Sequence, residues 1–190
     1  PGYINFFIST KNKYDQINTI LNSEDDLIQN VENTKNIHVE YVSANPTGPL
    51  HIGHGRGMIL GEVTAKFLSY QGHKIAREYY VNDAGRQIDL LLVSVLLCHL
   101  GKNKHIFVDE KTNDDGHLVT YKGNYVNDVA ISLRHDLEKI DKDSVLNLLD
   151  EPIDSLISFL KNHKSYSQIR NALVNVIIDE YIKEDLSAVG

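Results

Sequence analysis

The stretch that decides the fold of this chain is residues 43–56, which read SANPTGPLHIGHGR. Before it, residues 37–42 alternate between two faces, as a β-strand requires. After it, apolar residues recur at helical spacing up to Gly72, which is a natural helix terminator. A strand, a glycine-rich turn and a helix in this order can bind a phosphate. The turn presents main-chain N–H groups to it, and the helix presents the positive end of its dipole. We therefore expect an anion to bind beside His51 and His54.

A second strand and a second helix repeat this layout. The first helix, expected at residues 53–71, has an apolar stripe that should pack on a sheet, formed by Ile59, Leu60, Val63, Phe67 and Leu68. Residues 74–81 predict a strand, and residues 86–100 predict a helix that Gly101 closes. Such βαβ units build parallel sheets, so the sequence favours a nucleotide-binding α/β domain.

The remaining segments differ from these in composition and pattern. Residues 1–9 are rich in aromatic and β-branched side chains, which suggests a short strand or a packed arm. Residues 11–36 are polar with a short helical period and read as a connector. Turn-forming residues suit a hairpin or loop at residues 102–123. Helical periods return at residues 126–140, 153–160 and 167–189. We expect these helices to form an insertion packed beside the sheet.

Composition limits the kind of protein. With 190 residues, 42% of them hydrophobic and 24% charged, the chain has the make-up of a globular protein. Its net charge of −7 gives no global basic footprint for nucleic acid, so any RNA contact must be local or lie elsewhere. The single cysteine, Cys98, excludes an internal disulfide, fits a reducing cytosol and reads as a buried thiol. No targeting signal or membrane span is visible, because a span needs about 20 apolar residues.

The two histidines and the glycine between them suit phosphate chemistry. Gly53 lacks the Cβ that would keep a purine ring or a phosphate from the main chain. Imidazole donors at His51 and His54 can stabilise negative charge on a transferring α-phosphate. One alternative is that they are a pair of ordinary surface histidines at a turn. Another is a zinc site, but the sequence contains no H-E-x-x-H motif and no cysteine partner for these histidines. A P-loop motif is absent, and the dinucleotide fingerprint lacks its third glycine.

Two longer segments carry a more specific pattern. They are residues 39–56, VEYVSANPTGPLHIGHGR, and residues 77–88, REYYVNDAGRQI. Together they resemble the bacterial arginyl-tRNA synthetases, which are class I aminoacyl-tRNA synthetases. Residues 121–125, YKGNY, resemble the Y-x-G-x-Y element of that family. Residues 1–6 resemble its join between an N-terminal tRNA-binding domain and the catalytic domain.

The resemblance implies roles for individual residues. In class I synthetases the histidines of the HIGH motif assist ATP binding and the transition state of adenylate formation. His51 and His54 would therefore be catalytic and ATP-binding, and Gly53 would lie against the adenine. For arginine binding the resemblance implies Ser43 and Asn45, with Glu40 as a candidate acid near the same ligand. Asp83 and Gln87 are further candidates for arginine binding because of their place after the second strand.

Two of these residues also have structural readings. Glu40 could be a strand-end carboxylate that is hydrogen-bonded to the main chain. Asp83 could cap the helix that is expected to begin at Ala84, since aspartate is a favoured N-cap. The carboxyl ends of parallel strands are nevertheless where ligands collect, so Asp83 and Gln87 could reach an arginine pocket.

The expected architecture is the first half of a Rossmann-like class I catalytic domain with a mostly helical insertion. Residues 1–36 would be a connector from an N-terminal domain, 37–101 the half with the HIGH motif, 102–168 the insertion, and 169–190 a helix leading back to the second half. No KMSKS-like lysine loop lies in the sequence, and the acidic guanidinium-recognition residues are expected after Gly190. We therefore expect a piece of a longer protein that is inactive alone.

The resemblance implies an arginine–tRNA ligase that works in the cytoplasm. Its substrates would be arginine, ATP with Mg²⁺, and tRNA(Arg), with no tightly bound cofactor, no metal site of its own and a monomeric parent protein. A nucleotidylyltransferase of the H-x-G-H group would share the phosphate chemistry without the tRNA. A non-catalytic, synthetase-like binding module is the other alternative.

Overall fold

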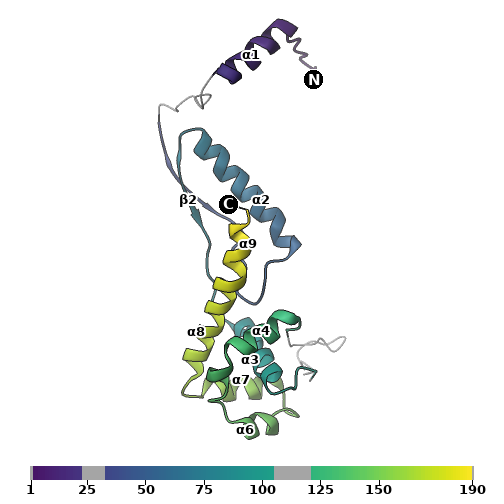
Figure 1. Ribbon diagram of the computed structural model, residues 1–190, viewed down its shortest axis with the longest axis vertical. Helices are drawn as coiled ribbons and strands as arrows, with labels where there is room; N and C mark the ends of the chain where they lie inside the picture. The colour runs from purple at the N-terminus through teal and green to yellow at the C-terminus, as the bar shows by residue number, and fades with distance from the viewer. Residues whose placement is uncertain (1, 23–32, 105–120, 190) are drawn as a thin grey trace.

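The computed structural model describes residues 2–22, 33–104 and 121–189. The chain is elongated, with helix α1 (Thr10–Asn22) at one end, a β-α-β unit in the middle and a group of helices at the other end (Figure 1). The β-α-β unit consists of β1 (Asn36–Glu40), α2 (Ile52–Tyr70) and β2 (Lys74–Glu78).

The two strands form the predicted parallel pair. Their register runs from Asn36 opposite Lys74 to Glu40 opposite Glu78. Both strands are shorter than predicted, since the expected ends were residues 42 and 81. Val42 and Ser43 have positive φ angles of 70° and 40°, which an extended strand cannot continue through. The α/β class is confirmed, and both carboxyl ends lie at one edge of the sheet.

Helix α2 packs on the sheet with a different face from the one predicted. Ile59, Leu60, Val63 and Phe67 of the expected stripe are 58%, 67%, 44% and 68% exposed. The buried residues of α2 are Gly61, Glu62 and Ala65. Gly61 allows the close approach, because a Cβ there would lie 2.2 Å from Cγ of Tyr41. The apolar period was correct for a helix but wrong for the contact face.

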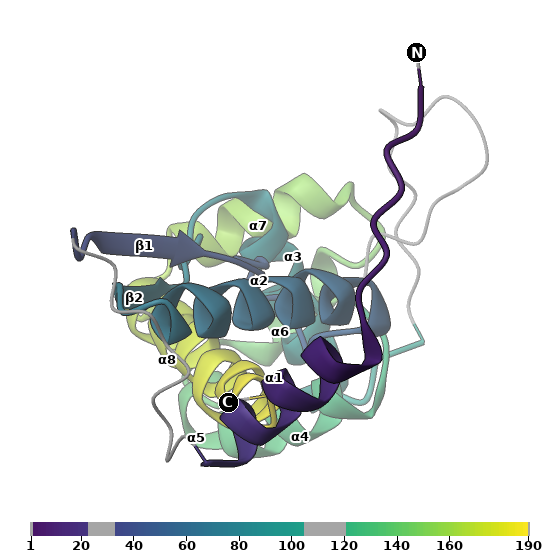
Figure 2. The ribbon, with the colours of Figure 1, turned by 90° about the horizontal axis from the view of Figure 1, so that it is seen from above.

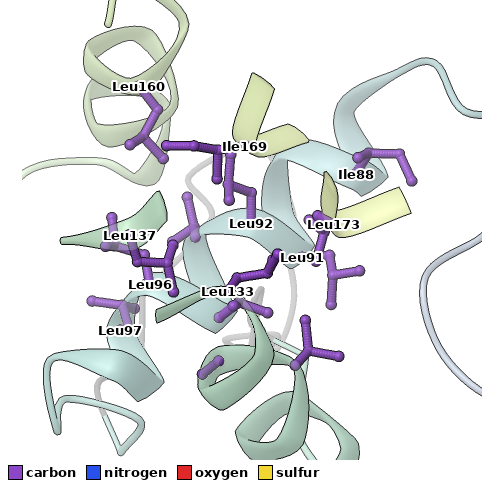
Figure 3. Close-up of a cluster of buried hydrophobic side chains, with 14 of the residues drawn as sticks. Ile88, Leu91, Leu92, Leu96, Leu97, Leu133, Leu137, Leu160, Ile169 and Leu173 are labelled. Atoms are coloured by element: carbon purple, nitrogen blue, oxygen red, sulfur yellow. The ribbon is translucent and has the colours of Figure 1, made fainter. Parts of the chain in front are cut away.

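The large hydrophobic core lies among the helices. Helix α3 (Arg86–His99) is buried from Ile88 to Leu97 except for the half-buried Leu90, and contacts helices on several sides. The others are α4 (Asn124–Ser132), α5 (Arg134–Leu137), α6 (Lys142–Asn147), α7 (Ile153–Lys161) and α8 (Tyr166–Ile177). Figure 3 shows leucines of α3 meeting side chains of the surrounding helices. The expected insertion therefore packs on α3 rather than beside the sheet.

One long helix links this group to the β-α-β unit. Helix α8 continues into a π-helical segment, η1 (Ile178–Ile182), and then into α9 (Lys183–Ser187). In Figure 1 this helix rises from the helical group towards β2 and α2. Leu186 and Val189 line a hollow together with Tyr41 and Met58, which places the end of the chain against the sheet unit.

The expected strand or packed arm at residues 1–9 is wrong. Residues 2–9 form no helix or strand, and Tyr3 and Phe7 are 98% and 95% exposed. Helix α1 buries none of its residues, and the view from above in Figure 2 shows it on the outside of the molecule. Most of the hairpin or loop expected at residues 102–123 lies outside the described residues.

Candidate nucleotide and amino-acid site

Helix α2 begins with a pair of stacked imidazoles. His51 is the N-cap, and its Nδ1 accepts a hydrogen bond from the main-chain N–H of Gly53 at 3.1 Å. Nδ1 of His54 accepts one from the main-chain N–H of His51 at 3.2 Å. The ring centroids lie 3.8 Å apart with an interplanar angle of 23°. Because an accepting imidazole nitrogen carries no proton, both neutral rings have their proton on Nε2.

This geometry changes which groups an anion would meet. The N–H of Gly53 is engaged by His51 in this conformation, so it is not free to donate to a phosphate. The Nε2–H groups of the two imidazoles are further donors at the helix start. Burial lowers the pKa of His54 from 6.5, and the nearby charge of His51 lowers this pKa further. His54 is therefore a neutral donor at pH 7.

Gly53 is required by the position of the His51 ring. A Cβ at residue 53 would lie 2.8 Å from Cε1 of His51. Any larger side chain would displace the imidazole from the N-cap position. The absence of a Cβ at Gly53, which was predicted to make room for a ligand, makes room for the His51 imidazole in this structure.

The imidazole pair borders a hollow of about 400 Å³. Of the predicted site residues, His51, His54, Asn45 and Gln87 line it. The rest of its lining comes from residues 44 and 47–50 and from Tyr121 and Tyr125. A hollow of about 770 Å³ between α3 and α4 contains none of the predicted site residues, so volume alone does not identify the site.

Three amides connect the ends of both strands to helix α3. Asn82 donates through Nδ2 to Oδ1 of Asn45 at 3.0 Å, and Asn45 donates through Nδ2 to Oε1 of Gln87 at 2.6 Å. The chain of amides fixes the orientation of Asn45 and brings Gln87 to the hollow. Sequence reasoning did not assign Asn82, although it lies in the quoted segment of residues 77–88.

Glu40 and Ser43 form a separate contact outside this hollow. Ser43 donates through Oγ to Oε1 of Glu40 at 2.8 Å and accepts a hydrogen bond from the N–H of Tyr80 at 3.0 Å. These bonds join the end of β1 to the chain after β2. The Glu40 carboxylate therefore accepts a hydrogen bond from a side-chain hydroxyl, whereas the structural alternative expected a bond to the main chain.

Asp83 lies outside the hollow as well. Its main-chain oxygen accepts a hydrogen bond from Nη2 of Arg170. The alternative role as a helix cap is wrong, because α3 begins at Arg86 and its N-cap is Gly85, with φ 98°. Aspartate cannot adopt that angle without strain, whereas glycine does so freely.

Three side chains that the sequence did not assign hold the turn before α2. Tyr79 donates to the main-chain oxygen of Ala44 at 2.5 Å, and Tyr125 donates to that of Thr47 at 2.9 Å. The main-chain N–H of Leu50 donates to Oδ2 of Asp185 at 3.0 Å. Tyr79 and Tyr125 lie in quoted motifs and could have been suspected. Nothing in the sequence pattern marked Asp185.

Within residues 2–22, 33–104 and 121–189, no group of three or more His, Cys, Asp or Glu side chains could hold a metal ion. Over that same part of the chain, no helix has both the length and the apolar character needed to cross a membrane.

Known proteins resemble this chain over most of its length. Residues 16–184 match the family described as tRNA synthetases class I (R), catalytic domain. The arginine–tRNA ligase of Hydrogenovibrio crunogenus is 46% identical over 134 residues, covering 70% of this chain and 22% of that protein. The arginine–tRNA ligase of Acidithiobacillus ferrooxidans is 34% identical over 201 residues, covering 100% of this chain and 34% of that protein.

A solved structure is also similar to this chain. The crystal structure of an arginyl-tRNA synthetase from Campylobacter jejuni aligns with a TM-score of 0.59 and 29% sequence identity, covering 94% of this chain and 34% of that chain. The matched part of this chain thus covers between about a fifth and a third of the length of these proteins.

Proposed function

This chain belongs to the catalytic-domain family of the class I tRNA synthetases for arginine, and from that membership we propose that it supplies the HIGH-motif half of an arginine–tRNA ligase site. The observation that carries the proposal is the stacked imidazole pair, which caps α2 at the edge of a hollow that also holds two amide side chains.

The proposed reaction has two steps. A carboxylate oxygen of arginine attacks the α-phosphorus of ATP, the bond to the β-phosphate bridging oxygen breaks, and arginyl-adenylate and pyrophosphate form. The aminoacyl group then passes to a terminal hydroxyl of tRNA(Arg), and AMP leaves. Each Nε2–H of His51 and His54 donates to oxygens of the reacting phosphate, where negative charge develops in the first step. Gly53 lies against the adenine, and Mg²⁺ enters with the phosphates of ATP.

Arginine binding is assigned to the amide side of the hollow. Asn45 and Gln87 lie there with oriented amides, which suits them to the α-amino and carboxylate groups of an amino acid. Glu40, Ser43 and Asp83 complete the proposed arginine-binding set. In the present conformation none of these three lines the hollow, so their part requires a shift of the main chain near the positive φ angles of Val42 and Ser43.

In this proposal the chain forms only part of the catalytic domain, and other parts of the full-length enzyme complete the site. Residues 1–36 connect to an N-terminal domain, 37–101 form the HIGH-motif half, 102–168 the insertion and 169–190 the return helix. Because the relatives are about three or more times as long, the 190-residue chain is inactive alone. The full-length enzyme is a cytoplasmic monomer that binds tRNA mainly through other domains. A nucleotidylyltransferase would share the imidazole pair, but the family match over residues 16–184 favours the ligase.

The test is arginine-dependent exchange of pyrophosphate into ATP by the full-length enzyme, with tRNA(Arg) present. His54→Ala removes one donor to the α-phosphate and should lower kcat by about 10²–10³-fold. His135→Ala is the matched control, because His135 is a histidine with a side chain 96% exposed on α5. Its exchange rate should equal that of the parent.

Three outcomes would overturn the proposal. An exchange rate for His54→Ala equal to the parent rate would exclude the role of the imidazole. Exchange that depends on another amino acid would exclude arginine as the substrate. Charging of tRNA by the 190-residue chain alone would show that the site needs no further residues.

A further inference from the structure

The turn that leads into α2 is held from outside its own β-α-β unit. Residues 41–51 belong to no helix or strand, so their main-chain polar groups need other partners. Tyr125 of α4 supplies a donor to the oxygen of Thr47, and Asp185 of α9 supplies an acceptor for the N–H of Leu50. These partners lie 78 and 135 residues further along the chain. The main chain is thus held at Thr47 and at Leu50, shortly before His51, by side chains of α4 and α9.

The Tyr125 ring fits between two glycines. A Cβ at Gly48 would lie 3.0 Å from Cζ of Tyr125, and a Cβ at Gly123 would lie 3.1 Å from its Cδ1. Tyr181 of η1 meets the same ring edge-on, with centroids 6.2 Å apart. Burial, with smaller contributions from Tyr121 and Tyr181, raises the pKa of Tyr125 to about 12. The hydroxyl therefore remains a donor over the whole physiological range of pH.

The π-helical segment η1 sets the direction in which Asp185 points. A π turn holds one residue more than an α turn, so the residues after it are rotated by about 100° from the positions an unbroken α-helix would give the same sequence. Tyr181 lies within η1 and Asp185 lies in the following α9. The same irregular segment therefore brings one side chain to Tyr125 and another to Leu50.

We propose that Tyr125 and Asp185 are positioning residues for the imidazole pair. By holding the main chain at Thr47 and Leu50, they fix the start of α2 and so the stacked arrangement of His51 and His54. Their catalytic importance rests on the proposed ligase function, whereas their control of the imidazole geometry does not. Helices α4 and α9 thereby act on the proposed nucleotide site through two hydrogen bonds.

The first experiment measures the imidazoles directly. In the 190-residue chain with ¹⁵N-labelled histidine, the Nδ1 and Nε2 shifts report the protonation of each ring nitrogen. Tyr125→Phe removes the donor to Thr47 but keeps the ring, and Asp185→Ala removes the acceptor for Leu50. Both substitutions should move the shifts of His51 and His54 and leave that of His135 unchanged. Asp185→Asn keeps an acceptor oxygen and should restore the parent shifts.

Matched controls separate positioning from a general loss of stability. Tyr166→Phe removes a tyrosine hydroxyl that donates to Asp89 in the helical group, away from the turn. Asp179→Ala removes a carboxylate of the same long helix that pairs with Lys183. Both controls should leave the shifts of His51 and His54 unchanged, even where the midpoint of urea unfolding falls.

The second experiment measures kcat and KM for pyrophosphate exchange in the full-length enzyme. Misplacement of the imidazoles should lower kcat by up to about 100-fold for Tyr125→Phe and Asp185→Ala, with a smaller change in KM for ATP. Unchanged imidazole shifts and kcat in an active parent would overturn the positioning role and leave the ligase proposal standing. Shifted imidazoles in a parent without exchange would overturn the ligase proposal and leave the positioning role standing.

Discussion

Glu62 and Arg77 form a two-point ion pair between α2 and β2. Nε of Arg77 lies 2.7 Å from Oε2 of Glu62, and Nη2 of Arg77 lies 3.0 Å from Oε1. Tyr41 donates its hydroxyl to Oε2 of the same carboxylate at 2.7 Å. Since Glu62 is only 3% exposed, this buried pair ties α2, β2 and the chain after β1 together.

This pair predicts a pH dependence of stability. Hydrogen bonds from Arg77 and then Tyr41 lower the pKa of Glu62 from 4.5 to about 2, although burial alone would raise it. A carboxylate whose pKa is lower in the folded state stabilises the fold above the unfolded pKa, and this contribution is lost as the pH falls. The free energy of unfolding should therefore decrease between pH 4.5 and about 2.

The control is Glu62→Gln, measured by urea unfolding over the same range of pH. The amide cannot ionise, so the variant should be less stable than the parent at neutral pH, and the difference between the two should shrink as the pH falls. A difference that stays constant down to pH 2 would contradict the assignment of this titration to Glu62.

Two glycines of α2 should respond in opposite directions to the same substitution. Gly61→Ala places a methyl group 2.2 Å from Cγ of Tyr41, so the helix or the Tyr41 side chain must move. Overpacking of this kind costs about 1–3 kcal/mol. Gly57→Ala meets nothing within 4 Å and should stabilise the helix by about 1 kcal/mol. Urea unfolding of both variants checks this, and equal effects would show that α2 does not pack through Gly61.

The sequence predicted the parts of the fold that depend on local pattern. The limits of α2 and α3 and the parallel pairing of two strands are confirmed. The contact face of α2 was not predictable from apolar periodicity, because the helix meets the sheet through Gly61 and Ala65, whose value lies in their small size. The burial of α3 among helices depends on tertiary packing, so the apolar residues of α3 alone could not predict it.

The candidate site likewise has features that the local sequence predicts and features that it does not. The capping of α2 by His51 follows from three adjacent residues, and it was foreseeable as a helix start. The amide contact of Asn45 with Gln87 follows from the shared edge of two parallel strands. The contact of Asp185 with Leu50 joins residues 135 positions apart through a π-helical segment, for which no local pattern existed.

The amide network predicts a selective effect on arginine. Asn45→Asp can still accept from Asn82 but can no longer donate to Gln87. Loss of one oriented hydrogen bond should raise KM for arginine by about 3-fold to 10-fold in the full-length enzyme. Asn147→Asp, on the exposed side of α6, is the matched control and should leave KM unchanged. If both variants raise KM equally, added negative charge and not the network is the cause.

The imidazole pair predicts how His54 titrates. Burial is the larger cause of its lowered pKa, and the charge of His51 is the smaller one. An NMR titration should therefore give His54 a pKa below 6.5. His51→Asn keeps a residue that favours the N-cap position and removes the charge. It should raise the pKa of His54 without restoring 6.5, because the burial remains.

The same titration carries a prediction for stability. Since the pKa of His54 is lower in the folded state, the fold should lose stability as the pH falls below 6.5, where the unfolded chain binds the proton first. Protonation of Nδ1 also removes the acceptor for the N–H of His51, so the capping contact should break together with the stack. A pKa of His54 at or above 6.5 would contradict its burial beside His51, and the proposed role of His54 as a neutral donor at pH 7 would then have no basis.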